Sequence, residues 1–244
     1  MAVIAFGLIW HFKQGLPSFD ELEDVDPART TNIYSADGKI LKKFWIQRRD
    51  PITYDQLPQA AIDGLISTED QHFWRHWGVS IPDIFRVVVR NVWVEGSLKG
   101  HGASTVTQQL ARNIFLTQDQ TWTRKVQEQL TAVLLERTYT KREIIEKYFN
   151  RMLFGRGAHG IEEAAQRFFG KRAKEMSIDE CALLVGLLKG PYYYSPVNHP
   201  LRAKDRRNLV LLQMHRVGKI STAEYRSARL RPIILKPLEE EIGE

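Results

Sequence analysis

The sequence predicts a mainly α fold with a short N-terminal β-hairpin, and three observations support this. From Tyr54 onward, apolar residues recur with helical spacing almost throughout. Before that point, the pair Asp37-Gly38 stands between two β-prone runs, which is a hairpin signal. The chain shows no internal repeat and no alternation of strands with helices, so a parallel sheet is not expected.

The N-terminal residues are expected to precede the folded domain. Residues 1–16 begin with the apolar run MAVIAFGLIWHF, which is shorter than the roughly 20 residues that cross a bilayer. The run lacks the basic region and cleavage site of a signal peptide, so we interpret residues 1–16 as a partial membrane anchor. A buried or interfacial helix is the alternative. Residues 17–30 hold Pro17, Pro27 and a cluster of acidic side chains without periodicity, which predicts a linker.

The helical part of the chain divides into successive segments with start and stop signals between them. The predicted helices cover residues 57–76, 81–95, 104–115, 121–138, 140–152, 160–168, 177–189, 199–217 and 221–229.

The first predicted helix, 57–76, carries a carboxylate where an apolar residue is expected. Ile62, Leu65, Ile66 and Phe73 form one apolar stripe with Glu69 near its centre. An ionised carboxylate in an apolar setting is costly, so it is usually paired, exposed at a cleft or retained for chemistry.

A second stretch, GHGASTVTQQLARN at 100–113, is a small-residue loop that leads into a helix with Ser104 or Thr105 as its cap. Free amide donors at such a helix start suit an anion or a sugar ring, although an ordinary capped helix explains the pattern equally well. Gln108, Gln109 and Arg112 favour contact with a ligand.

A third stretch places another carboxylate on a partly apolar helix face. Lys125, Glu128, Ala132 and Leu135 share one face of the predicted helix 121–138. A surface ion pair between Lys125 and Glu128 is the simplest explanation. Apolar residues on another face indicate an enclosed helix, and an enclosed Glu beside basic residues suggests a site.

The amino-acid composition indicates a folded domain and the charge of a partner, but it does not identify that partner. A hydrophobic fraction of 43% is ordinary for a folded domain, and a net charge of +6 suggests an anionic partner such as a phospholipid surface, a phosphate-bearing substrate or nucleic acid. The one cysteine, Cys181, excludes an internal disulfide, and its apolar surroundings predict a buried, inert thiol.

Three patterns suggest functions that the rest of the sequence does not support. GRGAHG at 155–160 fits a dinucleotide fingerprint, but helical periodicity precedes it where a strand is required. His72 and His76 are four residues apart, yet no third zinc ligand is evident. Basic residues in the predicted helix 199–217 are scattered over many faces, so we interpret them as solvated and expect no nucleic-acid partner.

Four long motifs, taken together and in order, resemble a known family. EDQHFWRHWG, GASTVTQQLARN, RKVQEQLTAVLLE and YFNRMLFGRGAHGIEEAAQRFFGK resemble the successive motifs of the glycosyltransferase family 51 domain of class A penicillin-binding proteins. The likeness runs from about Thr31 to Arg229, and four motifs with this spacing are far more specific than any short pattern.

The resemblance implies a lysozyme-like large lobe with a small membrane-proximal jaw lobe, formed by a glycosyltransferase domain at 31–230. Such a domain polymerises lipid II into glycan strands at the outer, periplasmic face of the bacterial cytoplasmic membrane and releases undecaprenyl diphosphate. Residues 231–244 would then be a C-terminal tail that starts a linker. Lipid II, the nascent glycan strand, membrane lipid, moenomycin-type inhibitors and other cell-wall synthesis proteins are the partners that the resemblance implies.

The resemblance also implies roles for individual residues. Glu69 would be the general base, Glu128 the second essential carboxylate, and Lys125, Arg112 and Arg124 the diphosphate-binding cations. No cofactor is required by the family pattern, although a divalent ion, Mg²⁺ or Mn²⁺, could assist at Glu128. Further substrate-binding residues carried over from the motifs are Asp70, Phe73, His76, Gly102, Ser104, Thr105, Gln108, Gln109 and Asn113.

The sequence departs from the family pattern in two places. Gln120 stands where the family usually has an arginine upstream of Lys125, so the resemblance implies one diphosphate contact fewer unless Arg124 or Arg112 compensates. No S-x-x-K motif occurs in these 244 residues, so we do not expect them to include a transpeptidase domain. Two alternatives therefore stay open: a lipid II-binding scaffold with weak catalysis, and a lytic muramidase that would also use a Glu on a helix.

Overall fold

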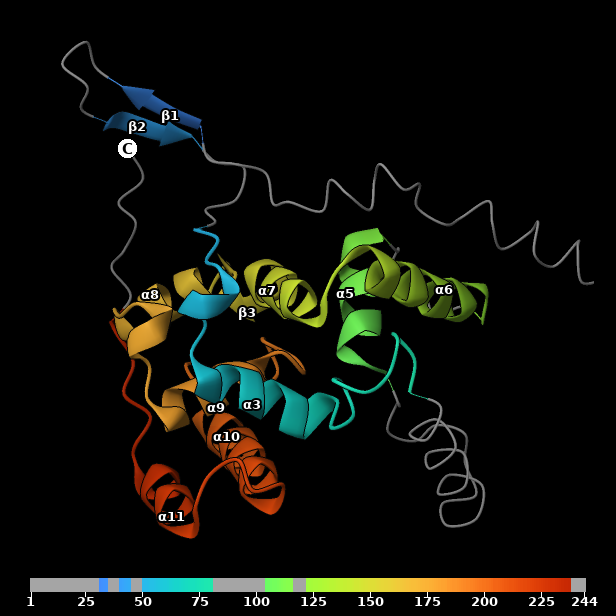
Figure 1. The fold of residues 1–244 in the computed structure, drawn as a ribbon. Helices are drawn as coiled ribbons and strands as arrows, with labels where there is room; N and C mark the ends of the chain where they lie inside the picture. Colours follow the sequence, from blue (N-terminus) through green and yellow to red (C-terminus); the bar gives the residue numbers. More distant parts are fainter. Residues whose placement is uncertain (1–30, 35–39, 45–49, 81–103, 116–121, 238–244) are drawn as a thin grey trace, which may run out of the picture. The chain divides into compact units, whose positions relative to one another are not determined.

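The structure is a computed structural model that describes residues 31–34, 40–44, 50–80, 104–115 and 122–237 (Figure 1). The predicted anchor 1–16, the predicted linker 17–30 and the predicted helix 81–95 lie outside the described residues.

The described residues are mainly helical, which confirms the predicted fold class at that level (Figure 1). The α-helices are α3 (Gln59–Glu69), α5 (Val106–Phe115), α6 (Trp122–Thr138), α7 (Lys141–Arg151), α8 (Ile161–Phe169), α9 (Ile178–Leu187), α10 (Pro200–Arg216) and α11 (Thr222–Leu230). The short 3-10 helices are η1 (Tyr54–Gln56) and η3 (Ala173–Glu175), and the strands are β1 (Thr31–Tyr34), β2 (Ile40–Phe44), β3 (Leu153–Gly155) and β4 (Ala158–His159). Strands β1 and β2 pair antiparallel, with Thr31 opposite Phe44.

The first predicted helix was too long. Helix α3 ends at Glu69, and a series of turns follows where helical spacing predicted seven more residues. The side chain of Asp70, the next residue, accepts a hydrogen bond from the distant backbone N–H of Val106 at 2.9 Å. Tertiary contacts of this kind compete with helix continuation, so Phe73 does not extend the apolar stripe of α3.

The Gly-rich stretch 155–160 forms the turn of a small hairpin, not a dinucleotide-binding loop. Strands β3 and β4 pair antiparallel, with Gly155 opposite Ala158. The two residues between them, Arg156 and Gly157, have φ of 52° and 70°. Positive φ at both central residues is typical of a type I′ turn. Sequence periodicity missed this hairpin because its strands are too short to show alternation.

The chain divides into two compact units. The first holds the described residues of Glu69–Lys147, and the second holds those of Pro27–Thr68 and Tyr148–Glu244. In the second unit, helix α3 packs closely against α9 and α10 at Gly64. A Cβ atom added to Gly64 would lie 3.4 Å from the side chain of Val210 in α10 and 3.5 Å from that of Val185 in α9.

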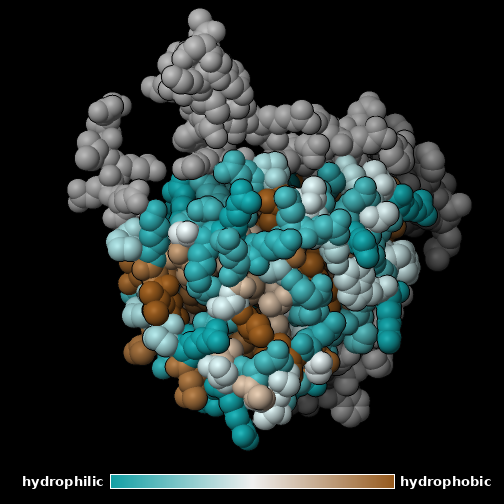
Figure 2. All heavy atoms as spheres, turned by 60° about the vertical axis from the view of Figure 1, so that its left-hand side comes forward, coloured by the Kyte–Doolittle hydropathy of each residue, from teal (hydrophilic) through white to brown (hydrophobic). Residues whose placement is uncertain are grey.

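One face of the molecule is mostly hydrophilic and is interrupted by apolar side chains in several places (Figure 2).

The segment after α11 is held against the second unit. Arg207, a buried residue of α10, donates to the backbone carbonyls of Arg229 at 3.0 Å and Arg231 at 2.7 Å. Farther along, the backbone N–H of Lys236 donates to the carbonyl of Phe168 at 2.7 Å. A buried guanidinium needs such partners, since leaving it without them would cost several kcal/mol.

The buried thiol generates a first prediction. Burial raises the pKa of Cys181 far above its usual range, because the thiolate would lose hydration. We expect a maleimide or disulfide reagent to leave Cys181 unmodified in the native protein and to modify it fully in denaturant. Rapid labelling of the folded chain at neutral pH would contradict the buried position.

A second prediction concerns Gly78, which lies against α6 in the first unit. Its φ is +96°, and an added Cβ would be 2.7 Å from the carbonyl oxygen of Ala132. Gly78→Ala should therefore lower the free energy of unfolding by about 2 kcal/mol or more, measured by urea denaturation. Gly218→Ala is the matched control, because Gly218 has φ of +74° but nothing within 4 Å of an added Cβ. Equal losses in the two variants would mean that the contact with α6 is unimportant.

Candidate active site

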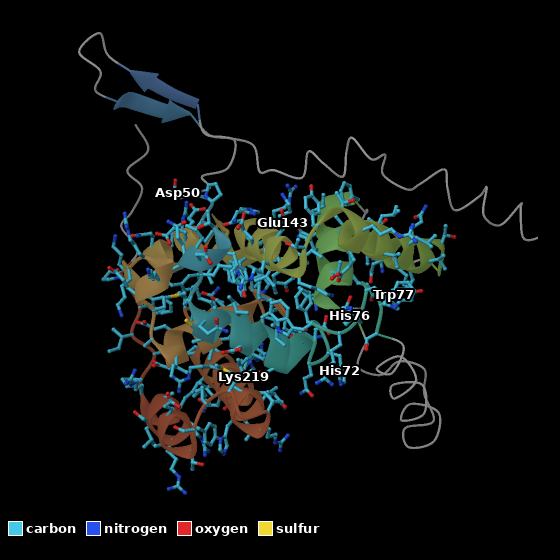
Figure 3. All side chains as sticks on the ribbon, in the orientation of Figure 1. Asp50, His72, His76, Trp77, Glu143 and Lys219 are labelled. Atoms are coloured by element: carbon cyan, nitrogen blue, oxygen red, sulfur yellow. The ribbon has the colours of Figure 1, made fainter. Side chains whose placement is uncertain are left out.

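The first unit brings together most of the predicted site residues. They come from the end of α3, the turns that follow it, α5 and the start of α6. His72, His76 and Trp77 mark the turns after α3 in Figure 3. Gly102 and Gln120 lie outside the described residues, so their predicted roles have no structural counterpart here.

Glu69 is the last residue of α3 and is partly exposed. The side-chain amide of Gln109 donates to its Oε2 atom at 3.3 Å. A partly exposed carboxylate can be reached from solvent, and its oxygens are hydrogen-bond acceptors. This environment is compatible with a general base, although it differs from the stripe centre that helical spacing predicted.

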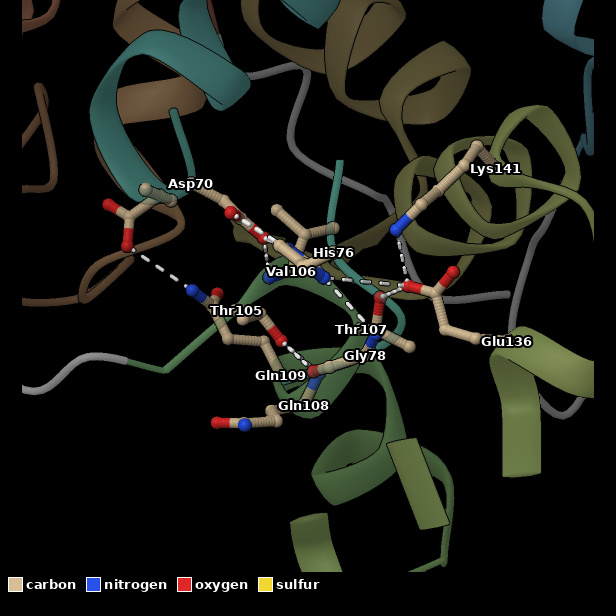
Figure 4. A network of polar contacts seen from close by, with 11 residues as sticks. Asp70, His76, Gly78, Thr105, Val106, Thr107, Gln108, Gln109, Glu136 and Lys141 are labelled. Carbon is tan, nitrogen blue, oxygen red and sulfur yellow. Dashed lines mark hydrogen bonds and ion pairs between the residues drawn. The ribbon is translucent and has the colours of Figure 1, made fainter. Parts of the chain in front are cut away.

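Asp70 and His76 face each other in the interior (Figure 4). They are 4% and 9% exposed, and the Nε2 atom of His76 is 2.9 and 3.0 Å from the two carboxylate oxygens of Asp70. The backbone N–H of Gly78 donates to Nδ1 of His76 at 3.1 Å. Both side chains were expected to bind substrate, and in the structure their polar atoms contact other parts of the same unit.

Thr105 caps helix α5. Its Oγ1 atom accepts from the backbone N–H of Gln108 at 3.1 Å and donates to the carbonyl of Gly78 at 2.6 Å. Of the two predicted cap residues, Thr105 therefore has this role. Ser104 instead accepts a hydrogen bond from the Nζ atom of Lys125 at 3.0 Å.

The start of α6 carries a cluster of charges around a fully buried carboxylate. Lys125 pairs with Oε1 of Glu128, and the Nη1 atom of Arg124 lies 3.2 Å from Oε2. The side chains of Arg124 and Lys125 are 14% and 34% exposed, while that of Glu128 is inaccessible. The ion pair between Lys125 and Glu128 considered from the sequence is present, but it is not a surface pair, because Glu128 is buried. The cluster carries a net positive charge and reaches the surface through its cations.

Glu136, on the same helix, is a further polar residue that the sequence motifs did not indicate. The Oε1 atom of Glu136 accepts from Oγ1 of Thr107 at 2.6 Å and from Nζ of Lys141 at 2.7 Å. It is also 4.0 Å from Nδ1 of His76. Glu136 stands two turns after Glu128, and that spacing on an enclosed helix was the signal that could have revealed it.

Gln108 is 1% exposed, and both polar atoms of its side-chain amide lack a hydrogen-bond partner within the described part of the chain. Leaving such a buried amide unpaired costs about 1–3 kcal/mol. An unpaired amide in this unit is compatible with the expectation that Gln108 contacts a ligand.

The remaining predicted residues differ in accessibility. Arg112 and Asn113, near the end of α5, are exposed. Phe73 is buried, with the Nζ atom of Lys141 4.3 Å from its ring centroid.

The described residues contain no group of three or more His, Cys, Asp or Glu that could hold a metal ion. Both carboxylate oxygens of Glu128 already accept from cationic side chains. The residues present therefore do not fit a metal ion held by Glu128.

Comparison with known proteins identifies the family. The transglycosylase family profile matches residues 37–215. The chain is 40% identical over 223 residues to penicillin-binding protein 1A of Aquifex aeolicus, which covers 91% of this chain and 30% of that protein. It is 38% identical over 230 residues to penicillin-binding protein 1A of Pseudomonas aeruginosa, which covers 93% of this chain and 27% of that protein.

A solved structure supports the same fold. The crystal structure of penicillin-binding protein 1A from Haemophilus influenzae matches with a TM-score of 0.51 and 24% identity, over 88% of this chain and 22% of that one. The chain thus spans less than a third of the length of these relatives. Together with the four motifs, these matches show that the chain belongs to the transglycosylase family, the glycosyltransferase domain of class A penicillin-binding proteins.

Proposed function

We propose that this chain is a peptidoglycan glycosyltransferase that polymerises lipid II into β-1,4-linked glycan strands. The observation that carries the proposal is that one short segment, residues 104–109, contacts both the proposed base and one of the proposed diphosphate-binding cations. Ser104 contacts the cation Lys125, and Gln109, five residues later, contacts the carboxylate of Glu69. A base and a charge-binding group are thus connected through the start of α5.

In the proposed reaction, Glu69 accepts the proton of the 4-hydroxyl of the acceptor lipid II. The hydroxyl oxygen forms a bond to the anomeric carbon of the growing chain, and the bond from that carbon to the diphosphate breaks. A single displacement inverts the anomeric centre and gives a β-1,4 linkage. Undecaprenyl diphosphate leaves with the electron pair, so a strong general acid is not needed.

We propose that Lys125 and Arg124 stabilise the negative charge that develops on the leaving diphosphate, with Arg112 as a further contact. Charge-assisted hydrogen bonds from cations to phosphate oxygens are among the stronger polar interactions in proteins. Glu128 orients both cations through the contacts described above. Cleaving a neutral glycan needs no such cations, so the charge cluster favours the transferase over a muramidase.

We propose that catalysis requires no cofactor. Since Glu128 is occupied by Lys125 and Arg124, a divalent ion that assisted the reaction would be held mainly by the diphosphate of the substrate. Because Gln120 replaces the arginine usual in the family, one cation is missing from the site. We propose that Arg124 or Arg112 takes the place of that cation.

We further propose that the domain has the lysozyme-like large lobe and small jaw lobe implied by the family, and that it works at the outer face of the bacterial cytoplasmic membrane. Residues 1–16 would anchor it, and moenomycin-type inhibitors would bind it. No helix in the described part of the chain is long and apolar enough to cross a membrane.

The direct test of the function is polymerisation of labelled lipid II in detergent, resolved on a gel with and without lysozyme. The wild-type chain should produce lysozyme-sensitive ladders, and Glu69→Gln should lower the rate at least about 100-fold because it keeps the size and removes the base. Asp205→Asn on the exposed surface of α10 is the matched carboxylate-to-amide control. A folded wild type that binds lipid II but forms no ladder would support the scaffold alternative.

The cation cluster generates a separate prediction. Lys125→Gln should raise the KM for lipid II about tenfold or more, because it removes a charge-assisted hydrogen bond to the diphosphate. Lys204→Gln, which removes the same charge from an exposed position on α10, should leave the KM unchanged. An unaltered KM in Lys125→Gln would argue against a contact between Lys125 and the diphosphate.

A further inference from the structure

We propose that Asp70 and His76 are positioning residues, which join the end of α3 to the start of α5 through a closed circuit of hydrogen bonds and thereby orient Glu69. This inference rests on the proposed function of Glu69 as the base. It gives Asp70 and His76 a different role from the substrate contact that the family motifs imply.

The circuit runs through five residues of the first unit and returns to its start (Figure 4). His76 bonds to Asp70 at 2.9 Å, and the N–H of Gly78 donates to His76 at 3.1 Å. The carbonyl of Gly78 accepts from the hydroxyl of Thr105 at 2.6 Å. The N–H of Val106, the residue after Thr105, donates to Asp70 at 2.9 Å and closes the circuit.

The circuit assigns the protonation of His76. A backbone N–H can only donate, so the Nδ1 atom that accepts from Gly78 carries no proton. The proton of the neutral ring is then on Nε2, where it is donated to Asp70. The carboxylate of Glu136 is 4.0 Å from Nδ1, beyond hydrogen-bond distance, so it does not replace Gly78 as the partner of this atom.

The acceptor capacity of Asp70 is used inside the protein. Its Oδ1 atom contacts His76, and its Oδ2 atom contacts both His76 and the N–H of Val106. Because α5 begins at Val106, the buried carboxylate also faces the positive end of that helix. These contacts explain why an ionised group is tolerated at a buried position.

The circuit is attached directly to the proposed base. Asp70 follows Glu69 in the chain, and Gln109, one helical turn after Thr105, donates to Glu69. Gly78 lies against the carbonyl of Ala132 in α6, the helix that carries the cation cluster. A shift of the circuit would therefore move Glu69 relative to both helices, and displacements of about 1 Å can lower a rate 100-fold.

Two substitutions of His76 each preserve half of its bonding. His76→Asn offers an acceptor near the position of Nδ1 but no donor to Asp70, and His76→Gln offers a donor near the position of Nε2 but no acceptor for Gly78. Each should lower kcat for lipid II polymerisation about 10- to 100-fold, with the KM changed less than about twofold. Asp70→Asn, which keeps only one acceptor oxygen, should behave in the same way.

His215→Gln is the matched control, since His215 lies in the second unit and stacks on Tyr225. It should leave kcat and KM unchanged. Thermal unfolding should show every variant folded at the assay temperature. A raised KM with unchanged kcat in the His76 variants would overturn the proposal and indicate substrate contact.

A second measurement needs no activity and so separates this inference from the proposed function. In ¹⁵N-labelled wild-type protein, the ring of His76, assigned by its loss in His76→Gln, should show a neutral tautomer protonated on Nε2. A Nδ1-protonated or doubly protonated ring at neutral pH would overturn the circuit. Failure of the wild type to polymerise lipid II, with the expected tautomer present, would count against the function and leave the circuit intact.

Discussion

The buried carboxylate of Asp70 is the interaction on which the geometry of the first unit depends. It accepts the first N–H of α5 and contacts a ring nitrogen of His76, so it joins the end of α3, the turns that follow it and the start of α5. A buried carboxylate without such partners would cost several kcal/mol, so the three segments are constrained to meet at this point. Glu69, the adjacent residue, takes its position as a consequence.

The charge cluster on α6 is built around a second buried carboxylate, that of Glu128. Glu128 is fully buried and is paired with both Arg124 and Lys125, which are partly exposed. The buried negative charge holds two cations together that would otherwise repel each other, and it leaves their outer faces accessible. The cluster is therefore a preorganised positive group, which is the arrangement that the proposed stabilisation of a leaving diphosphate requires.

Much of the fold was predictable from periodicity. The helices from α5 to α11 begin and end within about two residues of the expected positions, because each buries an apolar face of regular spacing. The exceptions are local: α3 stops at Glu69, and a hairpin at 153–159 interrupts the helical pattern. In both places hydrogen bonds or turn geometry overrode spacing, and neither leaves a periodic signal. Glu136 and Lys141 were missed because their pairing joins two helices.

The sequence by itself determined the candidate residues for the proposed chemistry and the helices on which they lie. Motif order identified Glu69, Lys125 and Glu128, and an apolar face indicated that Glu128 is enclosed. Only the tertiary structure decided how these groups are held. The bond between Val106 and Asp70 spans 36 residues, and that between Lys125 and Ser104 spans 21. Such contacts depend on how helices pack after they form, and a local sequence pattern contains no information about the partner that packing will supply.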